Sequence, residues 1–333
     1  MDCVILAAGK GTRMNSSKPK VLHEIGGKPL IEHLLESIDP LELTRVIVVV
    51  GYKEETVRNS LADRDIDFAV QEDQRGTAHA LQQAKDKIED DTFLVVPGDL
   101  PLVKTSSLET FIDFANNKKT DLALLTVNRD DPSGYGRIVR SGKGDIEEII
   151  EEQDADEEEK RIKEINAGIY FMLNRKDLWR ELDSIDSTNA QGELYLTDLV
   201  KRFAGRGKRV AGFQAEKPEE FLGVNTRKDL AFAGNVLNRR KMNSLLNSGV
   251  TLIDPESTVI ESKVSIGQDT IIEPFTIIRG ETSIGPHAKI GPHAEIVDSE
   301  IGQGAELSNA VVKSASVREN RSIEPFSFLG PNP

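Results

Sequence analysis

Four basic side chains and two glycines follow the first apolar stretch of the chain, and these residue types together can bind phosphate. The segment MDCVILAAGKGTRM (1–14) contains an apolar stretch at residues 2–8, which we interpret as a buried strand. Gly9 and Gly11 follow it. The basic side chains are Lys10, Arg13, Lys18 and Lys20. Glycine lets a backbone approach an oxyanion closely, while lysine and arginine supply countercharge. The spacing therefore predicts a phosphate-binding loop, with a surface turn carrying incidental basic residues as the alternative.

This loop matches neither of the two common phosphate-binding motifs. The P-loop pattern needs a serine or threonine where Gly11 follows Lys10. The dinucleotide fingerprint needs its third glycine where Met14 stands. The phosphate site is therefore of another kind.

A carboxylate stands at a second strand end. The segment VVPGDLPL (95–102) places Asp99 just after an apolar run. Open α/β sheets bind ligands at the carboxyl ends of their strands, and Mg²⁺ on phosphates takes one or two protein oxygens. Asp99 is thus a candidate Mg²⁺ ligand, although an aspartate after a strand is often only a turn former.

The elements that would position these residues alternate up to about residue 130. Two near-continuous apolar runs read as buried parallel strands, and they lie at residues 44–52 and 92–99. Helical spacing of apolar residues occurs at 29–38 and 77–88. This alternation predicts a doubly wound α/β sheet. From 134 to 226 the pattern is mixed, with a strand at 165–173 and a helix at 196–204, and one amphipathic helix is expected at 226–249.

Isoleucine then recurs every six residues near the end of the sequence. The positions are Ile266, Ile272, Ile278, Ile284, Ile290 and Ile296. A period of six fits neither a helix nor an ordinary strand, and it is the signature of a hexapeptide β-helix with a prism-shaped core. The register slips at Ile301 and continues loosely through Leu307, Val312, Val317 and Ile323.

The histidines do not indicate a metal site. His287 and His293 recur in GPHAKIGPHAEI, but residues six apart in a β-helix lie on different faces, so we expect two corner residues rather than zinc ligands. His79 begins the predicted helix at 77–88, and we expect it to pack.

Composition excludes several classes of protein. The formal net charge is −14, from 42 basic and 56 acidic residues, and no basic stripe suggests a nucleic-acid partner. No apolar run approaches the roughly 18 residues that span a membrane, and no charged leader precedes the first strand. The single cysteine, Cys3, is predicted to be a buried core thiol. We therefore expect a soluble, cytoplasmic protein.

The phosphate loop and the segments after it resemble the sugar-nucleotide pyrophosphorylases. LAAGKGTRM followed by KPKVL is similar to the signature of that family. Further segments follow in the family's order: QEDQRGTAHAL (71–81), PGDLPL (97–102), DDPSGYGRI (130–138), EINAGI (164–169), QGELYLTD (191–198) and GVNTR (223–227). With the hexapeptide tail, the chain resembles the bifunctional N-acetylglucosamine-1-phosphate uridylyltransferase / glucosamine-1-phosphate acetyltransferase family.

The resemblance implies a role for particular residues. The nucleotide would be bound by Leu6, Ala7, Ala8, Gly9, Gln71, Gly76 and Thr77. Arg13 and Lys20 would hold the phosphates as the catalytic residues, and Asp99 and Asn225 would bind Mg²⁺. The sugar would lie on Gly136, Glu151 and Asn166, with Tyr195 and Thr197 nearby. Pro97 and Ala167 depart from the tyrosine and threonine that relatives often carry, and both lie toward the sugar side.

The resemblance also implies a fold and a reaction. The fold would be a Rossmann-like nucleotidyltransferase domain (1–226) with a mixed, mainly parallel sheet, a linker helix (227–249) and a left-handed parallel β-helix (250–333). The reaction would join UTP and N-acetylglucosamine 1-phosphate into UDP-N-acetylglucosamine and pyrophosphate, with Mg²⁺ as cofactor.

Three further expectations belong to this reading. The β-helix segment resembles only the beginning of the relatives' β-helix, so we expect assembly into a homotrimer without acetyl transfer. A pyrophosphorylase for glucose 1-phosphate or another hexose 1-phosphate is the nearest alternative activity. A non-catalytic sugar-nucleotide-binding subunit is the other, and it would be expected to lack Arg13, Lys20, Asp99 or Asn225, all of which are present.

Overall fold

The computed structural model describes residues 1–331. These residues form two compact units. Unit 1 comprises Met1–His23 and Pro29–Asp229, and unit 2 comprises Glu24–Lys28 and the chain from Leu230 onward. The domain boundaries expected at residues 226 and 249 stay predictions, and residues 332–333 of the expected β-helix lie outside the described residues.

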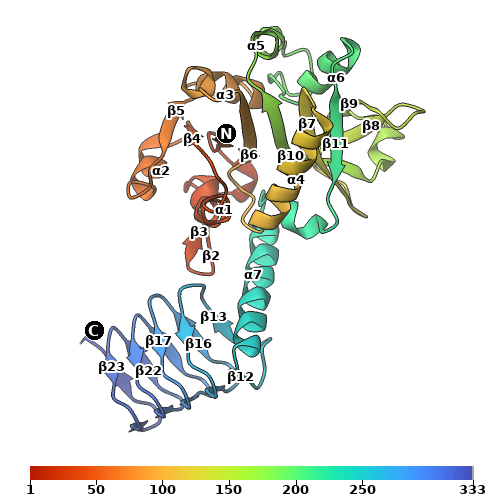
Figure 1. Cartoon of the computed structure of the whole chain (residues 1–333). Helices are drawn as coiled ribbons and strands as arrows, with labels where there is room; N and C mark the ends of the chain where they lie inside the picture. The colour runs from red at the N-terminus through yellow and green to blue at the C-terminus, as the bar shows by residue number, and fades with distance from the viewer. Residues whose placement is uncertain (332–333) are drawn as a thin grey trace. The chain divides into compact units, whose positions relative to one another are not determined.

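Unit 1 is built on a nine-stranded mixed sheet (Figure 1). Its strands are β1 (Asp2–Leu6), β4 (Arg45–Val50), β5 (Asp67–Val70), β6 (Thr92–Pro97), β7 (Leu122–Asn128), β8 (Arg137–Arg140), β9 (Ile146–Ile150), β10 (Glu164–Leu173) and β11 (Val210–Gln214). The main order is β11-β7-β10-β6-β1-β4-β5, and β8 and β9 extend it beside β10. Strands β6, β1, β4 and β5 run parallel, whereas β10 is antiparallel to both β6 and β7.

The central strands are apolar throughout because helices cover both faces of the sheet. The helices are α1 (Leu30–Ile38), α2 (Glu54–Ser60), α3 (Thr77–Ala84), α4 (Thr105–Lys118), α5 (Lys176–Asp183) and α6 (Asp198–Gly205). Cys3 and Ile5 pack in one core with α1 and α4, while Val4 packs in the other with α3, α5 and α6. Cys3 is a buried free thiol, as predicted, and burial raises its pKa to about 12.

Several elements differ from the sequence-based expectations. Strand β1 ends at Leu6 rather than residue 8, and β6 ends at Pro97 rather than residue 99, so Asp99 lies in a loop. The helix expected at 77–88 ends at Ala84, with a 3-10 turn after it. The helix expected at 226–249 is α7 (Arg227–Asn247), and it buries only Ala233, Met242 and Leu245. Its apolar face is therefore narrower than an amphipathic helix would show.

Unit 2 contains most of a short hairpin (Glu24–Lys28), most of α7 and a β-helix of three parallel sheets (Figure 1). The hairpin strands are β2 (Glu24–Ile25) and β3 (Lys28–Pro29). The first sheet holds β12 (Thr251–Leu252), β15 (Ile271–Ile272), β18 (Lys289–Ile290), β21 (Glu306–Leu307) and β24 (Ser322–Ile323). The second holds β13 (Val259–Ile260), β16 (Ile277–Arg279), β19 (Glu295–Val297), β22 (Val311–Lys313) and β25 (Phe328–Leu329). The third holds β14 (Ser265–Ile266), β17 (Ser283–Ile284), β20 (Glu300–Ile301) and β23 (Ser316–Val317).

One aliphatic residue of each short strand enters the core of the prism. Ile272 pairs with Ile290, which pairs with Leu307, and all three are buried. The coils are 18 residues long at first, but Ile284 pairs with Ile301, one residue short of that length. A shortened turn keeps the aliphatic ladder intact, which explains the slip in the sequence. The predicted fold class, a mixed α/β sheet followed by a hexapeptide β-helix, is confirmed.

The two β-helix histidines lie at corners, as expected. His287 and His293 have φ values of 58° and 55°, a left-handed conformation typical of tight turns. His293 stacks on Phe275 with ring centroids 5.1 Å apart. Within residues 1–331, no helix is long and apolar enough to cross a membrane.

Candidate functional site

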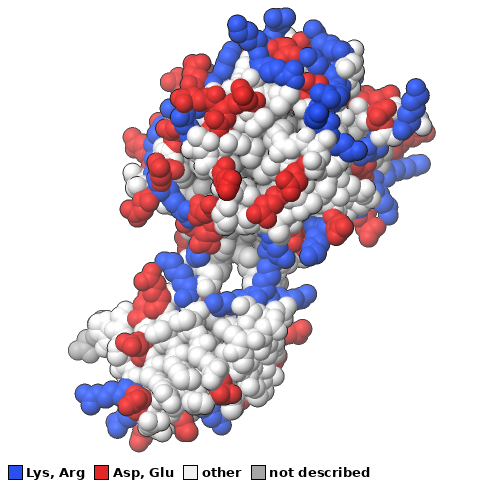
Figure 2. Space-filling model, viewed as in Figure 1, with Lys and Arg blue, Asp and Glu red and all other residues white. Residues whose placement is uncertain are grey.

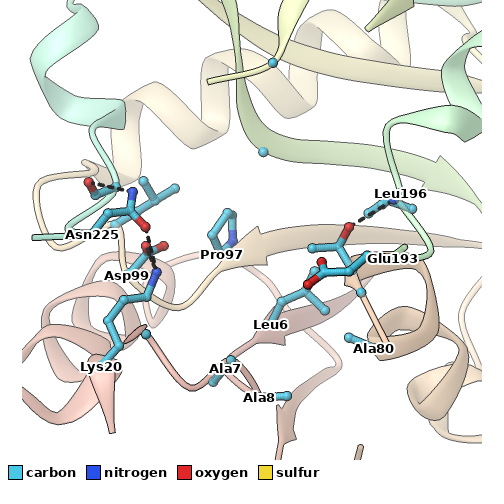
Figure 3. Close-up of a pocket in the computed structure, with 18 of the residues that line it drawn as sticks. Leu6, Ala7, Ala8, Lys20, Ala80, Pro97, Asp99, Glu193, Leu196 and Asn225 are labelled. Atoms are coloured by element: carbon cyan, nitrogen blue, oxygen red, sulfur yellow. Dashed lines mark hydrogen bonds and ion pairs between the residues drawn. The ribbon is translucent and has the colours of Figure 1, made fainter. Parts of the chain in front are cut away.

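Unit 1 contains a cavity of about 560 Å³ at the carboxyl ends of β1 and β6 (Figure 3). It brings together most residues of the predicted site: Leu6, Ala7, Ala8, Gly9, Lys20, Gln71, Gly76, Thr77, Asp99, Gly136, Glu151, Asn166 and Asn225. Thr197 also lines it, whereas Arg13 and Tyr195 do not. Such a cavity lies where open α/β sheets bind ligands, because the loops after neighbouring parallel strands meet there.

The glycine loop forms the floor of this cavity beside β1. The Ala7 N–H donates to the Val49 carbonyl at 2.9 Å, and the Ala8 carbonyl accepts from Tyr52 N–H at 3.1 Å, so the floor is fixed to the sheet. Gly11 has φ 64°, and a Cβ there would lie 2.7 Å from the Cβ of Lys20. Glycine is thus required at this point for Lys20 to reach the cavity.

Three polar side chains meet at one end of the cavity (Figure 3). The Lys20 ammonium forms an ion pair with Asp99 and donates to Asn225 Oδ1 at 3.1 Å. Arg13 Nη2 donates to the same Asn225 oxygen at 3.0 Å, which places this guanidinium beside the cavity although it does not line it. The backbone of Asn225 is fixed as well, because its main-chain N–H donates to Asp229 Oδ2 at 3.0 Å.

These residues also fit a divalent cation. Asp99, a buried carboxylate, and the amide oxygen of Asn225 already converge on one positive charge, the Lys20 ammonium. A Cβ on Gly223 would lie 3.2 Å from Asp99 Oδ2, so the glycine keeps this corner open. Among the described residues no three His, Cys, Asp or Glu side chains cluster as a metal site. A hard cation such as Mg²⁺ suits two protein oxygens of this kind if substrate and water oxygens complete its shell.

A second group of residues forms the wall beyond the floor. Gly76 has φ 114°, and a Cβ there would lie 2.4 Å from the Leu194 carbonyl oxygen. The Ala78 N–H donates to that same carbonyl at 2.9 Å, and the Leu196 N–H donates to the Thr77 hydroxyl at 2.9 Å. The start of α3 is therefore clamped to the 194–196 segment, and Gln71 lies beneath it, only 3% exposed.

A further wall of the cavity carries the residues expected to contact the sugar. The Thr197 hydroxyl donates to Glu151 Oε1 at 3.0 Å, and burial raises the pKa of Glu151. Asn166 lies at a bulge in β10, where its Oδ1 accepts from Gly168 N–H at 3.0 Å and its Nδ2 donates to the Tyr170 hydroxyl at 2.7 Å. Bulges commonly re-aim side chains beside active sites. The Tyr195 hydroxyl is buried and has no hydrogen-bond partner within residues 1–331.

Two features of the site were missed from the sequence. His79, expected only to pack, has its Nδ1 3.1 Å from Gln71 Nε2. Gly168 has φ 77°, and a Cβ there would lie 2.8 Å from Pro97 Cγ, so this glycine and the unusual Pro97 fit together. No periodic pattern in the sequence indicates the first contact, because the chain turns between Gln71 and His79. Only the fold reveals the second.

Comparison with known proteins matches both units. Residues 3–195 match the MobA-like NTP transferase domain, and residues 263–298 match the bacterial transferase hexapeptide (six repeats). The bifunctional protein GlmU of Syntrophomonas wolfei is 43% identical over 332 residues, covering 99% of this chain and 74% of that protein. The bifunctional protein GlmU of Clostridioides difficile is 42% identical, covering 98% of this chain and 71% of that protein.

Solved structures share the fold of unit 1. A UDP-glucose pyrophosphorylase complexed with UDP-glucose superposes with a TM-score of 0.58 at 20% identity, covering 72% of this chain and 98% of that one. HddC from Yersinia pseudotuberculosis gives a TM-score of 0.54 at 22% identity, covering 71% and 99%. At these identities the likeness shows the fold alone. The identity to the curated relatives over nearly the whole chain goes further: the chain belongs to the GlmU family, and it is a nucleotidyltransferase.

Proposed function

We propose that this chain transfers a uridylyl group from UTP to N-acetylglucosamine 1-phosphate, giving UDP-N-acetylglucosamine and pyrophosphate, with Mg²⁺ as its cofactor. The observation that carries the proposal is the convergence of Lys20, Asp99 and Asn225 beside the glycine loop in one cavity. Membership of the GlmU family and the NTP transferase match support the same reaction class.

The chemistry needs charge neutralisation and alignment more than proton transfer. A phosphate oxygen of the sugar phosphate attacks the α-phosphorus of UTP, and the bond from that phosphorus to its bridging oxygen breaks. The electron pair leaves with pyrophosphate. The attacking phosphate is already deprotonated, so no general base is required, and the barrier is mainly repulsion between two anions.

The residues of the cavity suit those needs. Lys20 would place its ammonium on the phosphate oxygens around the α-phosphorus, and Arg13 would neutralise the departing pyrophosphate. The open backbone of Gly9 and Gly11 would let the phosphates approach the floor. Asp99 and Asn225 would hold Mg²⁺, which supplies further positive charge to phosphate oxygens when bound.

Specificity would arise on the two other walls. We infer that Gln71, Gly76 and Thr77 bind the uracil and ribose over the floor formed by Leu6, Ala7 and Ala8. Gly136, Glu151 and Asn166 would receive the sugar. Gly136 gives close access there, since a Cβ on it would lie 2.8 Å from Ile149 Cγ2 and 3.4 Å from Glu151 Oε1.

For the β-helix we propose assembly into a homotrimer and no acetyl transfer. Its two histidines lie at exposed corners, and one of them is stacked on Phe275. The 250–333 segment contains no tyrosine. Both histidines are exposed to solvent, and we propose that neither acts as the base that acylation of an amine would need.

One substrate panel tests the proposal. Pyrophosphate release is measured with UTP or dTTP against N-acetylglucosamine 1-phosphate or glucose 1-phosphate, and acetyl-CoA consumption is measured with glucosamine 1-phosphate. We expect the highest kcat/KM with UTP and N-acetylglucosamine 1-phosphate and no acetyl-CoA turnover above a no-enzyme control. A preference for glucose 1-phosphate would contradict the sugar assignment, and acetyl-CoA turnover would contradict the role given to the β-helix.

A further inference from the structure

The amide group of Gln71 is held by two acceptors behind the cavity wall. Gln71 follows β5, and its Nε2 donates to the Gly76 carbonyl at 3.0 Å. A carbonyl oxygen can only accept, so the nitrogen end of the amide must face Gly76. The orientation of the Gln71 amide therefore follows from its partners.

His79 supplies the second acceptor. Its Nδ1 lies 3.1 Å from the same Gln71 nitrogen. Because that nitrogen carries only hydrogens, Nδ1 must accept, which requires the neutral imidazole with its hydrogen on Nε2. Both hydrogens of the Gln71 amide are then used, and within residues 1–331 its Oε1 accepts no hydrogen bond. Gln71 lines the cavity whereas His79, in the first turn of α3, does not.

We propose that His79 is a positioning residue that makes the site select uracil over cytosine by fixing the Gln71 amide with its oxygen toward the base. The inference rests on the proposed uridylyltransferase function. Uracil presents an N3–H donor between two carbonyl oxygens, and Oε1 can accept from it. Cytosine presents an acceptor at N3. A fixed Oε1 would then oppose another acceptor, and no hydrogen bond could form between the two atoms.

His79 is one of two groups that restrain the Gln71 amide, and the Gly76 carbonyl is the other. Without it, the Gly76 carbonyl still holds one amide hydrogen, but the amide loses a neutral hydrogen bond and turns or shifts more easily. The free energy that a neutral hydrogen bond usually contributes corresponds to about a three- to tenfold change in the preference for UTP over CTP. A partial loss of selectivity is therefore the expected effect.

The experiment compares kcat/KM for UTP and for CTP in the full-length chain. His79→Phe keeps a planar ring and removes the acceptor, and His79→Leu is a second replacement of different shape. Gln83→Ala is the matched control, because Gln83 lies one turn further along α3 and its Nε2 donates to the His79 carbonyl at 3.1 Å, not to its ring. We expect both His79 variants to lower the UTP-to-CTP ratio about three- to tenfold, with the KM for the sugar phosphate unchanged and the control ratio equal to wild type.

An unchanged UTP-to-CTP ratio in both His79 variants would overturn the inference. This holds whether kcat/KM keeps its wild-type value or falls equally with both nucleotides, as a purely structural role would give. If one variant fails to fold, as judged by circular dichroism, the other decides. Failure of the proposed function looks different, because the wild-type chain itself would then show no turnover with UTP.

Discussion

At the scale of single residues, Lys20 is the centre of the site. Its ammonium contacts both oxygens proposed to hold Mg²⁺, and Arg13 shares one of them. The same two side chains are proposed to bind the phosphates. Substrate phosphates would therefore draw Lys20 and Arg13 away from Asp99 and Asn225 and leave those oxygens for the metal.

Removal of Asp99 tests this arrangement. Asp99→Ala takes away a metal ligand and the ion-pair partner of Lys20, so we expect kcat/KM to fall by roughly a hundredfold or more. Asp86→Ala, which removes an exposed carboxylate of the same unit, should stay close to wild type. Pyrophosphate release across a magnesium titration gives the measurement. Full activity with unchanged magnesium dependence in Asp99→Ala would refute the assignment.

Burial of Glu151 makes a prediction about pH. Desolvation raises its pKa, against a hydrogen bond from Thr197 that lowers it. A raised folded-state carboxyl pKa favours folding below the unfolded pKa, and this contribution is lost as pH rises through the folded value. Glu151→Gln removes the cost of burying an ionised carboxylate, so it should raise Tm near pH 8. The expected rise is about 2–4 °C for each kcal/mol of that cost. Near pH 4 the carboxyl group is protonated in both states, and the rise should vanish.

Thermal unfolding of wild type and Glu151→Gln over that pH range measures this difference. Glu147→Gln is the control, because Glu147 is an exposed glutamate of the neighbouring strand β9. A gain in Tm that is constant with pH, or one shared by the control, would show that ionisation of Glu151 is not its cause.

Residue types alone identified the phosphate loop and Asp99, because glycine, cations and carboxylates at strand ends have few other joint uses. The resemblance to the family added Asn225, Glu151 and Asn166. The residues around them form no pattern from which a binding role could be predicted by chemistry alone. His79 was missed since its partner, Gln71, is reached only after the chain turns at Gly76. A polar contact across a turn is not visible in periodicity.

At the scale of elements, the strongest sequence signals were the buried runs of β4 and β6 and the six-residue repeat. Helices α2, α4 and α5 were not expected, because they are short or bury few residues, and packing against the sheet stabilises them more than their own sequence does. Strand ends were placed within two residues at β1 and β6, since the final residues leave the sheet to form the loops of the site.

The β-helix core offers a matched pair of neighbouring isoleucines. In β15, Ile272 is fully buried in the prism while Ile271 is 36% exposed. Ile272→Ala should cost about 2–5 kcal/mol of unfolding free energy, because it opens a cavity in the aliphatic ladder. Ile271→Ala should cost much less. Urea unfolding followed by circular dichroism compares the two, and equal losses would contradict the inward and outward assignment of the strand.

At the scale of the whole molecule, oligomerisation is the main prediction. A broad face of unit 2 carries few charged side chains (Figure 2), and several large apolar residues of its coils are exposed: Ile253, Val259, Ile271, Phe275 and Phe328. Weakly charged surface and exposed large apolar side chains are both typical of interaction surfaces. We expect a homotrimer through the β-helix, detected by light scattering.

Concentration is the variable to control in that measurement. Association through the β-helix follows mass action, so the trimer should dissociate on dilution. Phe275→Ser and Phe328→Ser should weaken it, whereas an exposed residue outside unit 2, such as Asp86→Ala, should not. A monomer at tens of micromolar in the wild-type chain would contradict the prediction.

The most direct test of the central claim is a crystal structure of the chain with UDP-N-acetylglucosamine and Mg²⁺. The account predicts the diphosphate within hydrogen-bond distance of Lys20 Nζ, with the metal between Asp99 and Asn225. It also predicts the uracil edge against Gln71 and Gly76 and the acetamido sugar beside Glu151. Product bound away from this cavity, or bound in it with the sugar against Gln71, would contradict the account.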